Sequence, residues 1–118
     1  MNRTRKTKGF TLVEIMIVVL IIGILLAIAV PNFLKARETS RTKTCVANMR
    51  QIEGAKEQWA METNQGATST PTAANLSPDY IKSALPGCPS GAAAYVINNM
   101  STNPTCGNVG TNPTHVLP

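Results

Sequence analysis

The sequence predicts an α+β protein in which a long, kinked N-terminal α-helix packs against a small C-terminal tail that contains short strands. Three observations support this fold class: an apolar run near the N-terminus, a one-sided apolar stripe after it, and a change after Gly66 to small, polar and turn-forming residues. The 118 residues leave room for one domain. We divide the chain into a basic leader, a transmembrane half-helix, an amphipathic half-helix and a loop-rich tail, which span residues 1–9, 10–31, 32–66 and 67–118.

The net charge of the chain is concentrated in the leader. The formal charge is +5, with 11 Lys and Arg residues against 6 Asp and Glu residues. Four of the basic residues precede Gly9, and the rest of the chain is nearly neutral. Aromatic residues are scarce as well, so the chain lacks an aromatic platform and a broad basic surface for nucleic acids. The basic run from Lys35 to Lys43 is interpreted as a solvated helix face, with a lipid-headgroup or DNA patch as the alternative. Nucleic acid is therefore not an expected partner. The basic leader residues are Arg3, Arg5, Lys6 and Lys8.

A membrane-spanning helix is predicted directly after the leader. The 21 residues from Phe10 to Val30 contain Thr11 and Glu14 as their only strongly polar side chains. As a helix they extend roughly 31 Å at about 1.5 Å per residue, which matches the ~30 Å hydrocarbon core of a bilayer. The alternative is a cleaved signal peptide, because residues 27–29 (Ala-Ile-Ala) fit its small-x-small pattern. The apolar run, however, exceeds the roughly 7–15 apolar residues of a signal peptide.

An amphipathic helical segment follows the apolar run. Its apolar side chains recur at spacings of three and four residues, as expected for one face of a helix. Because this pattern resumes after Pro31, we interpret Pro31 as a kink, made more deformable by Gly23, rather than as a helix stop. The helix is expected to run from Phe10 to about Asn64, with Gly66 as its left-handed cap. The members of the stripe are Cys45, Met49, Ile52, Lys56 and Trp59, flanked by Val46, Ala55 and Ala60.

The tail is predicted to contain one short helical turn and two or three short strands. Ser77 is the expected N-cap of the turn, with Pro78 at its first helical position. The strands are expected at residues 94–98 and 105–109, with a third at 115–117. The tail has few large apolar side chains to stabilise it. We therefore expect it to pack on the stripe and to need a covalent staple.

The stretch from Lys8 to Glu14, Lys-Gly-Phe-Thr-Leu-Val-Glu, carries the most specific signal in the chain. Together with the apolar residues that follow it up to Phe33, it closely resembles the processing site of type IV prepilins and type II secretion pseudopilins. The resemblance implies that a membrane-embedded prepilin peptidase cuts between Gly9 and Phe10 and then methylates the new amino group of Phe10. Glycine lets a protease approach the backbone closely. The alternative is that Gly9 merely begins the helix.

Glu14 is the only charged side chain within the apolar run. A carboxylate at the middle of a membrane costs about 2.5–3.5 kcal/mol, and less near the end of a span. A compensating partner is therefore expected. The family resemblance implies that Glu14 pairs with the Phe10 amino group of a neighbouring subunit during filament assembly. The alternative is that the carboxylate only reaches the membrane surface, because it lies close to the start of the run.

Three cysteines in a chain with a membrane-targeting segment favour an oxidising compartment. Cys88 (in Pro-Gly-Cys-Pro) and Cys106 (in Pro-Thr-Cys-Gly) lie in turn-like settings, and a disulfide between them would contribute roughly 3 kcal/mol. Cys45 lies on the stripe and is expected to be a buried thiol. A zinc site formed by the cysteines and His115 is the alternative, but no Cys-x-x-Cys pair is present. We expect no metal ion and no cofactor.

These features predict a structural filament subunit, a pilin or pseudopilin, rather than an enzyme, because no constellation of base and nucleophile is visible. The resemblance implies a single-pass protein of the bacterial inner membrane, with its C-terminal domain outside the cytoplasm. It would polymerise with itself and with other pilin-like subunits into a periplasmic or extracellular filament. Its other implied partners are membrane lipid, the prepilin peptidase, and an inner-membrane assembly platform with a cytoplasmic ATPase.

Two further functions stay open. One is a subunit of a DNA-uptake (competence) pilus, and the other is a single-pass membrane-anchored protein that does not polymerise. Major pseudopilins of type II secretion often hold calcium with acidic loop residues. Asp79 is the only acidic residue of the tail in this chain, which departs from that pattern.

Overall fold

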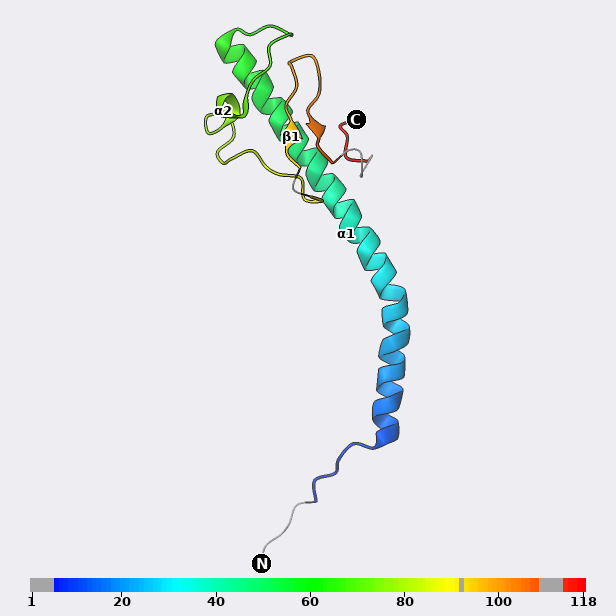
Figure 1. Cartoon of the computed structure of the whole chain (residues 1–118). Helices are drawn as coiled ribbons and strands as arrows, with labels where there is room; N and C mark the ends of the chain where they lie inside the picture. The colour runs from blue at the N-terminus through cyan, green and yellow to red at the C-terminus, as the bar shows by residue number, and fades with distance from the viewer. Residues whose placement is uncertain (1–5, 92, 109–113) are drawn as a thin grey trace, which may run out of the picture. The chain divides into compact units, whose positions relative to one another are not determined.

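The computed structural model describes residues 6–91, 93–108 and 114–118. The predicted α+β fold is confirmed, since a long N-terminal helix is followed by a small antiparallel sheet. By its contacts the chain divides into two compact units, with the boundary after Ala36. The elements in chain order are α1 (Leu12–Thr63), α2 (Ala73–Leu76), β1 (Tyr95–Val96) and β2 (Thr105–Cys106) (Figure 1).

The long helix α1 contains 52 residues and continues through both Gly23 and Pro31. Its C-terminal end is closed by Asn64, which has a positive φ of 53°, and the Gln65 N–H donates to the Ala60 carbonyl at 3.0 Å. This is the pattern in which a left-handed residue satisfies the last carbonyls of a helix. The prediction that Gly66 is the cap was wrong, because no described glycine has a positive φ. Asparagine reaches this conformation more easily than most residues.

The first unit exposes its apolar side chains over the whole surface of the helix. From Leu12 to Leu34, the large apolar side chains keep between 48% and 78% of their surface exposed. Among the described residues, α1 is the one helix long and apolar enough to cross a membrane, and none of its apolar window is buried. Apolar surface of this extent is stable against lipid or against other protein rather than in water. The first unit is therefore suited to membrane anchoring.

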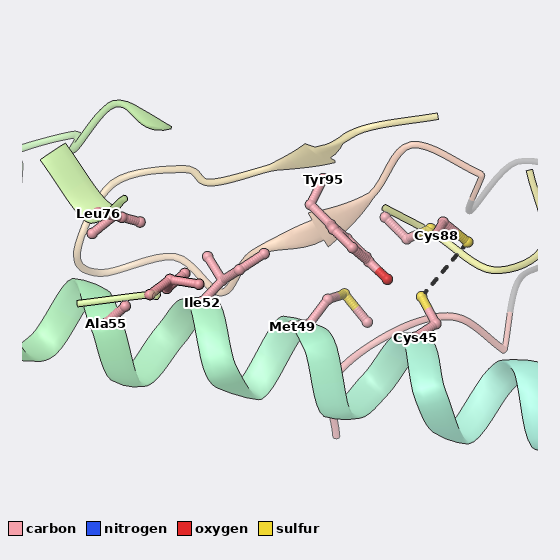
Figure 2. Close-up of a cluster of buried hydrophobic side chains, with 9 residues drawn as sticks. Cys45, Met49, Ile52, Ala55, Leu76, Cys88 and Tyr95 are labelled. Carbon is pink, nitrogen blue, oxygen red and sulfur yellow. Dashed lines mark hydrogen bonds between the residues drawn. The ribbon is translucent and has the colours of Figure 1, made fainter. Parts of the chain in front are cut away.

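The second unit has its core along one face of α1. The side chains of this face point toward the tail, as Figure 2 shows for four of them, and the tail covers them. The predicted stripe is confirmed, and so is the packing of the tail on it. The buried apolar residues are Cys45, Met49, Ile52 and Ala55 from α1 and Leu76, Ile81, Cys88, Tyr95 and Cys106 from the tail, with Val46 and Trp59 packed at the edge.

The two strands pair antiparallel, with Tyr95 opposite Cys106 and Val96 opposite Thr105. Tyr95 and Cys106 are buried, whereas Val96 and Thr105 are exposed, as the alternation of side chains along a strand requires. Cys106 therefore faces the core. The strands fall within the predicted segments 94–98 and 105–109, although each contains only 2 residues, and Val109 lies outside the described residues.

The third predicted strand, at residues 115–117, was wrong, because those residues have no strand structure. His115 is instead buried in the core, and its neighbours on either side are exposed. The segment has no neighbouring strand among the described residues with which to form a ladder. Strand structure depends on such a partner, and local sequence does not supply one.

The short helix α2 lies earlier than the predicted helical turn. It begins after Thr72, whose N–H donates to the Asn75 side-chain oxygen at 2.9 Å. Ser77 follows α2 instead of preceding it, so the prediction of Ser77 as N-cap was wrong. Thr72 and Asn75 use the reciprocal cap that Ser or Thr usually forms with Glu or Gln. The asparagine in the second position made this cap difficult to recognise.

The hydrogen bonds of Lys56 explain why a lysine occupies the apolar stripe. Its side chain is almost fully buried, and Nζ donates to the carbonyl oxygens of Ile97, Asn99 and Thr102 at 3.0, 2.8 and 2.8 Å. Burial lowers the pKa of Lys56 below its usual value, since desolvation disfavours the charged form. The three carbonyls use all three donors of an ammonium group. Lys56 therefore fixes the loop between β1 and β2 to α1.

Candidate functional site

The predicted processing site lies in an exposed segment without regular secondary structure. Residues 6–11 are not helical, and α1 begins at Leu12. A side chain at Gly9 would meet no atom within 4 Å, and Phe10 keeps 86% of its surface exposed. Because α1 begins at Leu12, the alternative in which Gly9 begins the helix is wrong. Proteolysis occurs preferentially in exposed backbone outside regular secondary structure, and the Gly9–Phe10 bond lies in such a segment. Arg3 and Arg5 of the leader lie outside the described residues.

Glu14 forms a capping box with Thr11 at the start of α1. The Thr11 N–H donates to Glu14 Oε2 at 2.9 Å, and the Glu14 N–H donates to Thr11 Oγ1 at 3.3 Å. These bonds satisfy two backbone donors that have no partner within the helix. The capping role was not predicted, although Thr-x-x-Glu is a known signal for it. Glu14 is exposed, so its carboxylate is accessible to a further partner.

Gly23 and Pro31 both lie inside α1. Pro31 has no N–H, so the carbonyl of Ala27 loses its helical donor at that point. Gly23 lowers the local helix propensity by about 1 kcal/mol relative to alanine. The predicted kink stays a prediction, because a continuous helix is compatible with a bend at either residue.

Three cysteines and the single histidine of the chain meet in the core of the second unit. The Sγ atoms of Cys45, Cys88 and Cys106 and a ring nitrogen of His115 all lie within 4.8 Å of one another, and all four residues are buried. Cys88 Sγ is 4.0 Å from Cys45 Sγ, the contact drawn as a dashed line in Figure 2. His115 Nδ1 is 3.5 Å from Cys88 Sγ and 3.9 Å from Cys106 Sγ. We call these four residues the Cys/His cluster.

The predicted disulfide between Cys88 and Cys106 is not confirmed, since all three cysteines are free thiols in the structure. The burial of Cys45 agrees with expectation. The four residues of the cluster come from α1, from the loop before β1, from β2 and from the C-terminal segment. Their sequence spacing contains no pair that signals a shared site, so only the folded chain brings them together.

His115 is fully buried, and its second ring nitrogen has no hydrogen-bond partner. Nε2 lies 3.8 Å from Glu38 Oε1, which is beyond hydrogen-bond distance. The Glu38 carboxylate is half exposed and lies 3.9 Å from Arg41 Nη1. The imidazole therefore presents Nδ1 to the thiols and Nε2 to a carboxylate.

The surroundings of Cys88 favour its thiolate. Burial raises the pKa of Cys88, but hydrogen bonds from Asn108, Ser90, Cys106 and His115 outweigh burial and lower the pKa to about 6. Burial raises the pKa of Cys45 to about 12 and also raises that of Cys106. Three sulfur atoms and one imidazole nitrogen that lie this close together suit a soft or borderline metal cation.

Comparisons with known proteins identify the N-terminal motif and several relatives of the chain. Residues 4–30 match the family model of the prokaryotic N-terminal methylation motif. The chain is 35% identical over 112 residues to type II secretion system core protein G of Escherichia coli (strain K12), covering 83% of this chain and 77% of that protein. No solved structure matches the chain.

Two further relatives match about half of this chain. Type IV major pilin protein PilA of Myxococcus xanthus (strain DK1622) is 42% identical over 60 residues, which cover 51% of this chain and 27% of that protein. Competence protein ComGC of Streptococcus pneumoniae serotype 4 is 38% identical over 63 residues, which cover 53% of this chain and 58% of that protein. The residues that match the family model, 4–30, contain the Gly9–Phe10 junction and the apolar run that follows it.

Proposed function

Because this chain belongs to the family of type IV pilins and pseudopilins, and is a structural subunit rather than an enzyme, we propose that it is cut after Gly9, anchored in the inner membrane and polymerised into a filament. The observation that supports the proposal most directly is the exposed Gly9–Phe10 junction, which immediately precedes a helix with an uncovered apolar surface. In this proposal the prepilin peptidase also methylates the new amino group of Phe10, and the second unit lies outside the cytoplasm.

Polymerisation follows from the uncovered apolar half of α1. In the membrane its side chains contact lipid, and in a filament they contact the same segments of neighbouring subunits. The exchange needs no catalytic residue, since packing between helices replaces packing against lipid. Repetition of one head-to-tail contact generates a helical polymer. By family resemblance, an inner-membrane assembly platform and a cytoplasmic ATPase supply the force, and other pilin-like subunits can join the same filament.

We expect the mature chain to begin at a methylated Phe10. Intact-mass measurement of the protein from its native host should give residues 10–118 plus one methyl group. Gly9→Val should leave the chain uncut, because its new side chain meets nothing in the fold but crowds the peptidase. Gly66→Val is a matched control, since a side chain at Gly66 is equally unobstructed, and it should be processed normally. A native mass that includes residues 1–9, or a start at Val30, would contradict the proposed processing.

We also propose that the helix loosens between Ala27 and Pro31 when subunits pack in the filament. The missing donor at Pro31 removes one hydrogen bond of the helix, and Gly23 weakens the turn before it. A filament map from electron microscopy should show a departure from regular α-helix in this segment. Pro31→Ala should make the helix regular there, since it restores the donor. A straight, unbroken helix from Gly23 to Phe33 in wild-type filaments would be inconsistent with this expectation.

A subunit of a DNA-uptake pilus is the second candidate function. The relative named competence protein ComGC favours it, and exposed basic residues follow the apolar run at Arg37 and Lys43. The chain without its leader is nearly neutral, however, with seven basic against six acidic residues. Salt-dependent retention of DNA by the mature chain would favour this candidate over a secretion pseudopilin.

A further inference from the structure

We propose that the Cys/His cluster binds one zinc ion, which joins the tail to α1. Cys45 lies on α1, Cys88 in the loop before β1, Cys106 on β2 and His115 in the C-terminal segment. Each residue offers one sulfur or nitrogen donor, which is the donor set that structural zinc sites use. The proposal does not rest on cleavage or polymerisation, because it concerns residues outside the first unit.

The distances between the donor atoms are close to those of a tetrahedral zinc site. Zinc bonds of about 2.3 Å to sulfur and about 2.0 Å to nitrogen place two thiolates roughly 3.8 Å apart, and a thiolate and an imidazole nitrogen roughly 3.6 Å apart. The Cys88–Cys45 distance is 4.0 Å, and the two sulfur distances to His115 Nδ1 are 3.5 and 3.9 Å. No pair of donor atoms exceeds 4.8 Å. Small side-chain rotations would therefore complete the site.

The orientation of His115 matches that of a metal ligand. A zinc-bound histidine usually directs its other ring nitrogen to a carboxylate or carbonyl, which fixes the tautomer. Here Nδ1 faces the thiols while Nε2 is buried without a hydrogen-bond partner, 3.8 Å from Glu38 Oε1. Metal binding at Nδ1 requires the proton to be on Nε2. After a small movement, this Nε2–H can donate a hydrogen bond to the Glu38 carboxylate. An otherwise unexplained buried nitrogen thereby obtains a function.

Backbone hydrogen bonds fix the positions of two of the cysteines, Cys88 and Cys106. The Asn108 N–H donates to Cys106 Sγ at 3.4 Å, and such N–H donors stabilise a metal-bound thiolate. The Gly91 N–H donates to the Cys88 carbonyl at 3.3 Å, which closes a turn that holds Cys88 in place. Two of the three thiols therefore lie in backbone settings that limit their motion.

Zinc accounts for the cluster more completely than a disulfide does. A bond between Cys88 and Cys106 would use two of the four donors and leave Cys45 and His115 buried beside it without a role. It would also need an oxidant to accept two electrons and two protons. Zinc binding needs only the release of protons from the thiols. The donor set contains no oxygen, so it does not suit calcium or magnesium.

Zinc would supply the staple that the tail needs. Each of the four ligands comes from a different segment, so one ion links α1, the loop before β1, β2 and the C-terminal segment. Four protein ligands leave no open position for a water molecule or substrate, which is characteristic of a structural rather than a catalytic site. Loss of the ion is expected to release the C-terminal segment first, since His115 is its only member of the cluster.

The proposal can be tested on the chain purified from membranes in detergent, with or without residues 1–9, because the four proposed ligands lie outside that segment. After reduction and dialysis against Zn²⁺, the protein should contain about one zinc per chain. With Co²⁺ in place of Zn²⁺, the absorption spectrum should show tetrahedral ligand-field bands and sulfur-to-cobalt charge transfer. Protein isolated without a reductant, then denatured in the presence of a chelator and alkylated, should carry the label on all three cysteines, because none of them forms a disulfide. These measurements use the wild-type chain, so they do not depend on the folding of any variant.

Variants assign the ligands. Cys45→Ser and His115→Gln should each lower zinc affinity at least tenfold, whereas Thr44→Ser and Thr114→Ala, at the exposed neighbouring positions, should not change it. His115→Cys should retain the metal and shift the cobalt charge-transfer bands, because a fourth sulfur replaces nitrogen. Glu38→Gln should lower affinity by about tenfold if the carboxylate orients the imidazole.

Several results would overturn the proposal. One is a Cys88–Cys106 disulfide in the native protein. Another is the absence of zinc and of a tetrahedral cobalt spectrum after reduction and loading. A third is zinc binding that survives both Cys45→Ser and His115→Gln unchanged, since the ion would then lie elsewhere. Because none of these measurements requires a filament, their failure is distinguishable from failure of the assembly proposal.

Discussion

Lys56→Met is expected to lower the free energy of unfolding of the second unit by about 2–4 kcal/mol. The substitution removes the three hydrogen bonds that the Lys56 ammonium group donates. The carbonyls of Ile97, Asn99 and Thr102 then lack this donor. Methionine has a similar length and needs no desolvation, which offsets part of the loss. The lost hydrogen bonds dominate, because the three bonds are part-buried and a bond from a charged donor contributes about 1.5–3 kcal/mol.

The measurement is denaturant unfolding of the mature chain in detergent, followed by the fluorescence of Trp59, which packs at the edge of the core. Lys82→Met is the matched control, because Lys82 is exposed, and it should change stability by less than about 0.5 kcal/mol. Lys56→Arg should also be destabilising, since a planar guanidinium cannot replace a compact ammonium among three converging carbonyls. Equal stability of the Lys56→Met and Lys82→Met variants would show that the buried ammonium contributes nothing to the fold.

Glu14→Val is expected to abolish filament assembly or impair its order while leaving cleavage intact. In the proposed filament the Glu14 carboxylate pairs with the Phe10 amino group of a neighbouring subunit. A charge pair in an apolar environment contributes register more than stability, and each added subunit requires the same register. The apolar run only becomes longer in the variant, so membrane insertion should be unaffected.

The capping box makes Glu14→Gln the decisive companion variant. Glutamine can keep the reciprocal bonds with Thr11, but it removes the negative charge. If the charge pair directs assembly, both variants should fail to form normal filaments. If Glu14 acts only as a helix cap, Glu14→Gln should assemble normally and Glu14→Val should lose about 1 kcal/mol of helix stability. If it only reaches the membrane surface, both variants should assemble normally.

Assembly can be followed by electron microscopy of sheared filaments from cells that express each variant alone, with immunoblotting for the processed form. Thr11→Ala is a useful control, because it removes the cap hydroxyl and keeps the carboxylate. It should assemble if charge pairing is the essential function. Normal filaments from fully processed Glu14→Val protein would show that Glu14 has no role in assembly.

Local patterns determined most of the helix and of the core face. The apolar run, the spacing of Met49 and Ile52, and the extent of α1 were predictable because a helix of known period places those side chains without reference to the rest of the chain. The prediction of the junction at Gly9 and Phe10 likewise rests on a contiguous motif, which lies within the residues that match the family model. The errors in local structure, Gly66 for Asn64 and Ser77 for Thr72, were errors in choosing between neighbouring residues that can each form a cap.

Tertiary structure decided the contacts of Lys56 and the Cys/His cluster, because these depend on which distant segments of the chain meet. Nothing near Lys56 in the sequence indicates that three carbonyls from the loop between β1 and β2 surround its ammonium group. The Cys/His cluster is the clearest case. Cys45 and His115 are separated by most of the second unit, and their donor atoms come together only when the tail folds back over α1. Spacing along a chain reports contacts within one helix or turn, whereas a site built from four segments exists only after those segments have packed.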